Sequence, residues 1–427
     1  MPATTNVNVS DLGNIDTNNN ITNNGTLKLS ATTETLNNTI TTTENSGALE
    51  FVSGVISVSD TATIKQNTMK VADDTQLITK LSNLQVTDDI TNEGILKLTV
   101  TETNLDNNII DSKENKTGAL TINGSGILNA NGKEIVQKSL TIENVDAGLQ
   151  ITIDKLNISD TDIYNAGSLK LSGVGEDGAA VEFKHSLSGN GTLYISDTSN
   201  VIATNKIMNM INNSGMITID AINVGNSIIN NANDYENSKA LILDGGTLTQ
   251  TISGTGTLVI KGSDTNKVVA NASITQDKLI VLTGAVLEAN IDNLTINSSN
   301  AINNTGTIRL FAVGDKNLNN DITGGLVSGT LEILGGKINT NTHTIDQQEL
   351  IIHDGKLTVN ADKLIIATAK VENAGTLTLI GGTIDEEITG TGTTEITGTV
   401  IAENAIKQEI IISSGALTID AENVGGK

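Results

Sequence analysis

Few residues of this chain have the types and spacing that chemistry requires. The stretch Gly173-Val174-Gly175-Glu176-Asp177-Gly178 matches the Gly-x-Gly-x-x-Gly pattern of dinucleotide sites. Such a site needs a helix directly after the glycines, because the helix N-terminus holds the pyrophosphate. The short run 179–183 leads into a strand step instead, and two acidic residues in the loop would repel phosphate. We interpret the stretch as an insertion between strands that binds no cofactor, with four residues as a possible variable binding loop: Gly173, Glu176, Asp177 and Gly178.

The residues that could hold a metal ion or act as nucleophiles are equally scattered. The three histidines, His185, His343 and His353, show no His-x-x-x-His spacing, and cysteine is absent. Acidic pairs such as Asp73-Asp74 and Asp88-Asp89 lack the spacing of a calcium loop. No Gly-x-Ser-x-Gly elbow marks a serine hydrolase. The sequence therefore predicts no metal site and no catalytic residue.

The elements that position these residues come from a six-fold internal repeat of about 70 residues. Its clearest motif is Gly-x-Leu-x-Leu/Ile, as in Gly25-Thr26-Leu27-Lys28-Leu29. Unit four replaces the motif with Ala240-Leu241-Ile242-Leu243. The first apolar anchors are Leu27, Leu96, Leu169, Leu241, Ile308 and Leu377. A chain that repeats in this way is a stack of like units.

Two further anchor series share the period. The second is Leu49, Leu120, Leu193, Leu258, Leu331 and, degenerate, Thr394. The third is Val7, Leu77, Leu149, Ile217, Leu287, Leu357 and Leu417, several of which open a phrase like Ile217-Thr218-Ile219-Asp220-Ala221. Three anchors per unit suggest three turns of chain per unit, each about 23 residues long.

Each anchor alternates apolar and polar residues, which is the period of a half-buried strand. Between anchors, apolar pairs four residues apart, such as Leu36/Ile40 and Leu105/Ile109, lie among Thr, Asn and Gly, which disfavour helix. The pattern predicts an all-β fold, a single parallel β-solenoid of about 18 coils over residues 1–427. We expect repeat units at about 1–76, 77–148, 149–216, 217–286, 287–356 and 357–427. The inward residues should include Leu27, Leu49, Leu96, Leu120, Leu169, Leu193, Leu258, Leu331 and Leu377.

Charged residues also follow the repeat. The residue between the apolars of the first anchor is basic in four units, and the matching residue of the second anchor is acidic in three. If these anchors lie on adjacent coils, Lys28 faces Glu50 and Arg309 faces Glu332. We interpret these charges as a solvated face that fixes register rather than as a ligand site.

Composition excludes several classes of function. The net charge of −24 makes binding to nucleic acid or to an anionic membrane face unfavourable. No apolar run approaches the 18 or more residues of a membrane span. The first residues do not resemble a signal peptide, and the chain starts and stops in the same repeat phase. We expect an internal piece of a longer protein.

Polysaccharide lyases and hydrolases also use β-solenoids, so a polysaccharide-active enzyme is the main enzymatic alternative. That chemistry needs clustered carboxylates and aromatic residues that stack on sugars. Aromatics make up 1% of the chain, tryptophan is absent, and the one arginine is Arg309. The paired Glu386-Glu387 should alternate faces on a strand. We therefore rank this enzyme third among the functions considered.

Two phrases carry a family likeness. Asn373-Ala374-Gly375-Thr376-Leu377-Thr378-Leu379 and Gly254-Thr255-Gly256-Thr257-Leu258-Val259-Ile260, in a long Asn/Thr-rich array without cysteine, resemble the passenger domains of bacterial autotransporter adhesins. The resemblance covers nearly the whole chain and implies a right-handed parallel β-helix exported across the outer membrane to the cell surface, or secreted. It also implies an outer-membrane translocator, which we expect outside this segment. The serine motif of protease-type members is missing.

The sequence therefore predicts a non-enzymatic adhesin or self-association segment. Its partners would be a host surface, a neighbouring cell or a second copy, with no nucleic acid. The alternative is a passive structural stalk that displays a distal domain.

Overall fold

The computed structural model describes residues 4–6, 20–43, 46–298, 302–324 and 329–425. They form two compact units, Met1–Ile211 and Asn212–Lys427, and each is a parallel β-solenoid. Among these residues there is no α-helix, only single 3-10 turns. None of the helical segments in this part of the chain is long and apolar enough to cross a membrane. The predicted fold class is confirmed.

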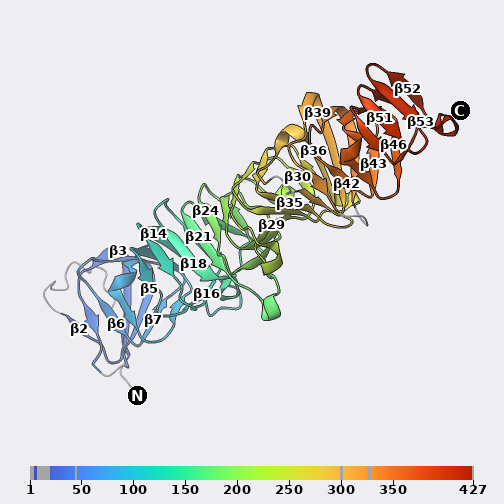
Figure 1. The fold of residues 1–427 in the computed structure, drawn as a ribbon. Helices are drawn as coiled ribbons and strands as arrows, with labels where there is room; N and C mark the ends of the chain where they lie inside the picture. Colours follow the sequence, from blue (N-terminus) through green and yellow to red (C-terminus); the bar gives the residue numbers. More distant parts are fainter. Residues whose placement is uncertain (1–3, 7–19, 44–45, 299–301, 325–328, 426–427) are drawn as a thin grey trace. The chain divides into compact units, whose positions relative to one another are not determined.

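In the first unit, each coil carries one short strand on each of its three sides, and two of these sides belong to one sheet because β5 pairs with both β7 and β8. In Figure 1, β18, β21 and β24 run alongside one another, and they pair in parallel. The largest sheet contains β3 (Thr26–Leu36), β5 (Ala48–Val58), β7 (Thr68–Val71), β8 (Thr75–Lys80), β10 (Ile90–Asn92), β11 (Ile95–Val100), β13 (Ile109–Ile110), β14 (Ala119–Gly124), β16 (Ile135–Gln137), β17 (Ser139–Ile142), β19 (Leu156–Ile158), β20 (Asp162–Asn165) and β23 (Ser186–Ser188). A second sheet contains β12 (Thr103–Asn104), β15 (Ile127–Asn129), β18 (Gly148–Thr152), β21 (Ser168–Ser172) and β24 (Thr192–Ile195).

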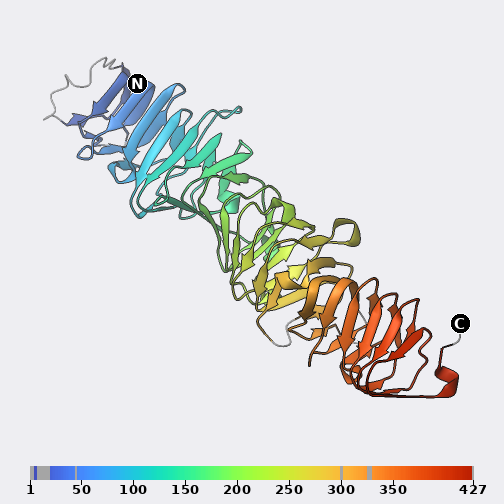
Figure 2. The same cartoon turned by 90° about the horizontal axis from the view of Figure 1, so that it is seen from above.

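The second unit repeats this plan, and its orange and red strands stack in the same way in Figure 2. One of its sheets contains β27 (Met216–Ile219), β29 (Ala240–Leu243), β32 (Thr257–Ile260), β35 (Lys278–Val281), β38 (Ile302–Asn304), β40 (Ile322–Thr323), β42 (Ile345–Gln347) and β45 (Leu364–Ile366). Another contains β33 (Val268–Ala270), β36 (Val286–Asn290), β39 (Thr307–Asn317), β41 (Thr330–Asn339), β43 (Glu349–Ile352), β44 (Lys356–Val359), β46 (Lys370–Asn373), β47 (Thr376–Leu379), β49 (Glu387–Thr389), β50 (Thr393–Ile396) and β52 (Glu409–Ile412).

The three anchor series stack directly on one another inside the coils, apart from Val7, which lies outside the described residues. Leu77 pairs with Leu96, and Leu96 pairs with Leu120. The same order holds for Leu149, Leu169 and Leu193, and for the corresponding residues of the later repeats. All nine leucines expected to face inward are buried, none more than 5% exposed. Burying such side chains contributes about 1.5–3 kcal/mol each, which makes these columns the main stabilising feature.

Each repeat advances by three coils and one additional side of a coil. From Leu96 the column passes to Leu120, Leu140 and Ile163, one coil at a time. The next first anchor, Leu169, follows Ile163 within the same coil but lies in the second sheet. A repeat of about 70 residues therefore makes about three and one-third turns, and the described chain forms about 20 coils, in agreement with the predicted solenoid of about 18.

The phrase that opens at the third anchor forms a strand followed by one 3-10 turn. β27 ends at Ile219, and the turn η5 (Ala221–Asn223) begins two residues later. The same turn follows the third anchor of five other repeats, as η2 (Leu81–Asn83), η3 (Ile153–Lys155), η8 (Ile291–Asn293), η9 (Ala361–Lys363) and η10 (Ala421–Asn423). This turn makes a corner of the coil.

The predicted charge pairs are also confirmed. Lys28 lies opposite Glu50, with Nζ 2.7 Å from the carboxylate. Arg309 lies opposite Glu332, with Nε 3.2 Å from the carboxylate, and also contacts Asp264 at 2.8 Å. Such partly exposed pairs contribute at most about 1 kcal/mol each. They favour the correct register more than they add stability.

We predict that Leu193→Asp destabilises the first unit locally, because it buries an unpaired charge among Leu169 and its neighbours at a cost of about 3 kcal/mol or more. Native-state hydrogen exchange should show that protection is lost first in the coils around residue 193. Thr198→Asp, at an exposed position close by, is the control and should leave exchange unchanged. Uniform loss of protection along the unit would contradict local stacking.

Candidate functional site

The asparagine of the Asn-x-Gly motif points into the solenoid, not into solvent. Asn92 is fully buried, and its Nδ2 donates hydrogen bonds to Ala119 O at 3.0 Å and to Gln137 Oε1 at 2.5 Å. Gln137 is also fully buried and lies two coils further on, since Ile90 pairs with Ile109 and Ile109 with Ile135. The two amides therefore bond across an intervening coil.

A glycine of the intervening coil makes this contact possible. A Cβ on Gly118 would lie 2.2 Å from Asn92 O and 2.7 Å from Gln137 Oε1, which is closer than such atoms approach. We call the three residues an amide bridge: an asparagine, a glycine of the next coil and an amide of the coil after that. Six bridges occur among the described residues, Asn23–Gly47–Gln66, Asn92–Gly118–Gln137, Asn165–Gly191–Asn209, Asn230–Gly256–Gln276, Asn304–Gly329–Gln347 and Asn373–Gly392–Gln408, with amide contacts of 2.5–3.3 Å.

The amide bridge was not predicted from the sequence. The asparagine resembles an ordinary turn residue, and its partner is 35–46 residues away in the chain. A signal was present in the glutamines, which end the phrase Ile-x-Gln in five of the six repeats, at 64–66, 135–137, 274–276, 345–347 and 406–408. A buried polar residue needs a partner, so a buried glutamine that recurs in phase should have indicated one.

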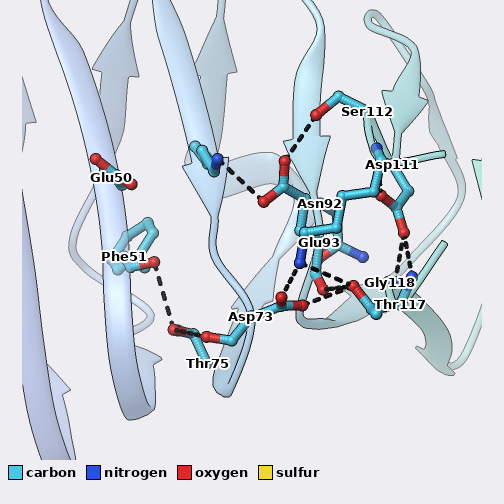
Figure 3. Close-up of polar contacts among 12 residues, drawn as sticks. Glu50, Phe51, Asp73, Thr75, Asn92, Glu93, Asp111, Ser112, Thr117 and Gly118 are labelled. Carbon is cyan, nitrogen blue, oxygen red and sulfur yellow. Dashed lines mark hydrogen bonds and ion pairs between the residues drawn. The ribbon is translucent and has the colours of Figure 1, made fainter. Parts of the chain in front are cut away.

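A cluster of polar side chains surrounds the second amide bridge (Figure 3). Asp111 is buried, and its carboxylate accepts hydrogen bonds from the backbone N–H groups of Lys113, Thr117 and Gly118, at 3.0, 2.6 and 2.7 Å. These bonds close the loop 112–117, which returns the chain to Gly118. The carboxylate thereby holds the glycine in the position that the amide bridge requires.

Two further carboxylates of the cluster also have partners. Glu93, 7% exposed, accepts a hydrogen bond from Ser112 Oγ at 2.7 Å and pairs with Lys70 at 3.0 Å. Asp73 accepts one from Thr117 Oγ1 at 2.6 Å and pairs with Lys113. Carboxylates bound in this way stabilise a loop. The cluster borders an open groove of about 560 Å³ that also exposes Ile95.

The predicted binding loop lies on the surface between β21 and β22 (Val181–Phe183). Glu176, Asp177 and Gly178 form a single 3-10 turn, and all three are exposed. Gly173 O accepts a hydrogen bond from Asn200 N at 3.0 Å, and Gly178 O accepts one from Asn200 Nδ2 at 3.1 Å. Asp177 and Gly178 have positive φ, which allows the tight turn. Their role as a binding loop stays a prediction.

The three histidines do not come together. His185 is half-buried at an open groove of about 460 Å³, with Nδ1 3.1 Å from Asp160 O and its ring edge-on to Phe183. Burial lowers the pKa of His185, which favours its neutral form. His343 contacts Asp321, and His353 contacts Glu332, each at 3.1 Å. Within the described chain, no three His, Asp or Glu side chains are grouped so that they could hold a metal ion.

One carboxyl of the second unit is unusually buried. Glu386 is 5% exposed, and its Oε1 accepts a hydrogen bond from Ile366 N at 2.9 Å, while Oε2 is buried without a hydrogen-bond partner. Burial raises the pKa of Glu386 above the ordinary value of a glutamate. The adjacent Glu387, the first residue of β49, is less buried and pairs with Lys407, whereas Glu386 lies in the bend before the strand and points inward.

Comparisons with protein-family models, with curated proteins and with solved structures return no match to this chain. The class that its structure defines is the parallel β-solenoid. Any function must therefore be argued from the surfaces and contacts of the solenoid itself.

The amide bridge predicts a large difference between two glycines of the second unit. Neither has positive φ, but a Cβ on Gly256 would meet Asn230 Nδ2 at 2.4 Å, whereas one on Gly335 would meet nothing within 4 Å. Gly256→Ala should lower the free energy of unfolding by about 1–3 kcal/mol, as overpacking does. Gly335→Ala, the matched control, should change it little. Equal effects in urea unfolding would show that no close contact exists at Gly256.

Glu386 predicts a specific pH dependence. A carboxyl with a raised pKa holds its proton more tightly in the folded state, so the free energy of unfolding falls as the pH rises through and above the ordinary glutamate range. Glu386→Gln mimics the protonated form and should remove that contribution. The variant should be more stable than the parent near pH 7 and equally stable near pH 4, by urea unfolding. Glu387→Gln is the control. If it changed the pH dependence of the free energy of unfolding as much as Glu386→Gln does, the assignment of that dependence to Glu386 would be contradicted.

Proposed function

We propose that this chain is a non-enzymatic adhesive or self-associating segment, displayed on a cell surface or secreted. The observation that carries the proposal is that side chains on the outer faces form rows in register. In the first unit one row runs through Thr121, Thr141, Tyr164 and Ser188, one residue per coil. Adjacent strands of such a row are about 4.8 Å apart, so the residues that carry these hydroxyl groups repeat at a fixed backbone spacing.

Repetition of this kind favours binding by many weak contacts. A single exposed hydroxyl or amide adds little affinity, because it exchanges one hydrogen bond with water for another. When one contact forms between two aligned rows, the next forms at high effective concentration, and the contacts sum to avidity. A second copy or a repetitive surface on a host or neighbouring cell would fit such rows.

We further propose that this chain is a passenger domain of an autotransporter. This proposal is supported by the β-solenoid fold and by the resemblance of the Asn-x-Gly-Thr-Leu phrases. Export across the outer membrane and a translocator outside this chain follow from that identity. Two alternatives remain, a passive stalk that displays a distal domain and, third, a polysaccharide-active enzyme.

The proposal predicts salt-dependent clumping of cells that display this chain. The net charge of −24 opposes contact between copies at low salt, and screening within about 8 Å at physiological ionic strength relaxes that repulsion. Clumping, followed by the settling of cell suspensions, should therefore increase from low to moderate salt. Cells that display an unrelated solenoid of similar charge are the control. Absence of clumping and of host-surface binding at every salt concentration would favour the stalk.

A further inference from the structure

The fourth repeat carries an apolar row on an outer face, where other repeats place polar side chains. Ile242, Val259 and Ile280 pair in sequence across β29, β32 and β35. Their neighbours in the same strands, such as Leu241 and Leu258, fill the interior, so these three side chains face outward. At the corresponding positions the fifth repeat has the ion pair of Arg309 and Glu332.

A short flap, residues 233–239, covers this row. Its base is an antiparallel bridge between Asp234 and Lys239, with hydrogen bonds of 2.9 and 3.0 Å. The Asp234 carboxylate accepts hydrogen bonds from Asn237 N and Nδ2, at 3.3 and 2.8 Å, which close the turn. Tyr235 packs against the cluster of Met216, Ala240, Ile242, Val259 and Ile280. Asn233 Oδ1 accepts a further bond from Thr257 Oγ1 at 2.8 Å, which fixes the flap to β32.

An open groove of about 480 Å³ lies beside the flap. Its apolar lining comes from Tyr235, Ile280 and Leu282, and its polar lining includes Asn303, an exposed amide, and Thr305. This volume lies in the range of sites for small organic ligands, which join apolar walls to a few polar groups. The charged groups around it are Asp234, Glu236 and Lys278, so its net charge is negative.

We propose that this groove binds a neutral, N-acetylated sugar chain. The ring of Tyr235 offers an apolar surface for the C–H face of a pyranose ring. The Asn303 side chain carries both a donor and an acceptor, which match the C=O and N–H of an acetamido group. The acetamido methyl group would lie against Ile280 and Leu282. An acidic sugar is disfavoured, because Asp234 and Glu236 outnumber Lys278.

The inference deepens the proposed adhesive function by naming a ligand class, and it rests on that function only for its biological purpose. Its test uses the purified full chain and N,N′,N″-triacetylchitotriose, followed by ligand-observed NMR titration. We expect saturable binding with a Kd on the order of 1 mM, typical of an open groove with few polar contacts. Maltotriose, which lacks acetamido groups, and 3′-sialyllactose, which is anionic, should each bind at least about tenfold more weakly.

Variants assign the binding to the groove. Tyr235→Ala and Asn303→Asp should each weaken chitotriose binding by about tenfold or more. Tyr164→Ala, at an exposed tyrosine of the first unit, is the matched control and should not change it. Asn303→Asp keeps the size of an exposed side chain and should leave the flap in place. It therefore tests the groove even if Tyr235→Ala loosens the flap.

Three results would overturn the inference: no saturable chitotriose binding, binding that both groove variants leave unchanged, or tighter binding of 3′-sialyllactose. The outcome is separate from that of the adhesive proposal. A chain that clumps cells but binds no chitotriose would retain the proposed function and lose this site. A chain that binds chitotriose but neither clumps cells nor binds a host surface would retain this site and lose the proposed function.

Discussion

The backbone hydrogen bonds of each coil have their partners in the next coil, and the rest of the structure depends on that constraint. Leu120 and its partner Leu140 are 20 residues apart in the chain, and Ile163 and Leu187 are 24 apart. No coil can satisfy its polar backbone or bury its apolar residues alone. Stability is therefore a property of the contact between coils, and any feature that fixes this contact also fixes the fold.

Two kinds of contact fix the register of neighbouring coils. Aliphatic columns supply most of the free energy, but apolar contacts are non-directional. The amide bridges add direction, because an asparagine and a glutamine two coils apart must meet across a glycine that leaves them room. Shifting a coil by one residue would leave these buried amides unpaired, at about 1–3 kcal/mol for each group. The bridges thus penalise wrong registers more than they stabilise the correct one.

Much of this fold could be predicted from the sequence, because short-range periodicity encodes it. Alternation at the anchors identified strands, and the shared period identified which strands stack, down to the pairing of Lys28 with Glu50. The amide bridges were missed because amide side chains are equally common in turns. The extra third of a turn in each repeat was not predicted, because the spacing of the anchors does not show where one coil ends and the next begins. The flap at Tyr235 depends on which strand face points outward, and that follows only from the assembled coils.

Disulfide formation between engineered cysteines tests this stacking most directly. The chain has no native cysteine, so only the engineered pair can form an intramolecular disulfide. A strictly three-coil repeat would pair Leu120 with Leu149, and so Thr121 with Gln150. The structure pairs Thr121 with Thr141 instead. Adjacent residues of neighbouring strands lie within the Cα separation that a disulfide bridges, about 4.4–6.8 Å. We predict that the double variant Thr121→Cys/Thr141→Cys oxidises readily and that Thr121→Cys/Gln150→Cys does not. The opposite result would contradict the stacking of coils described for this chain.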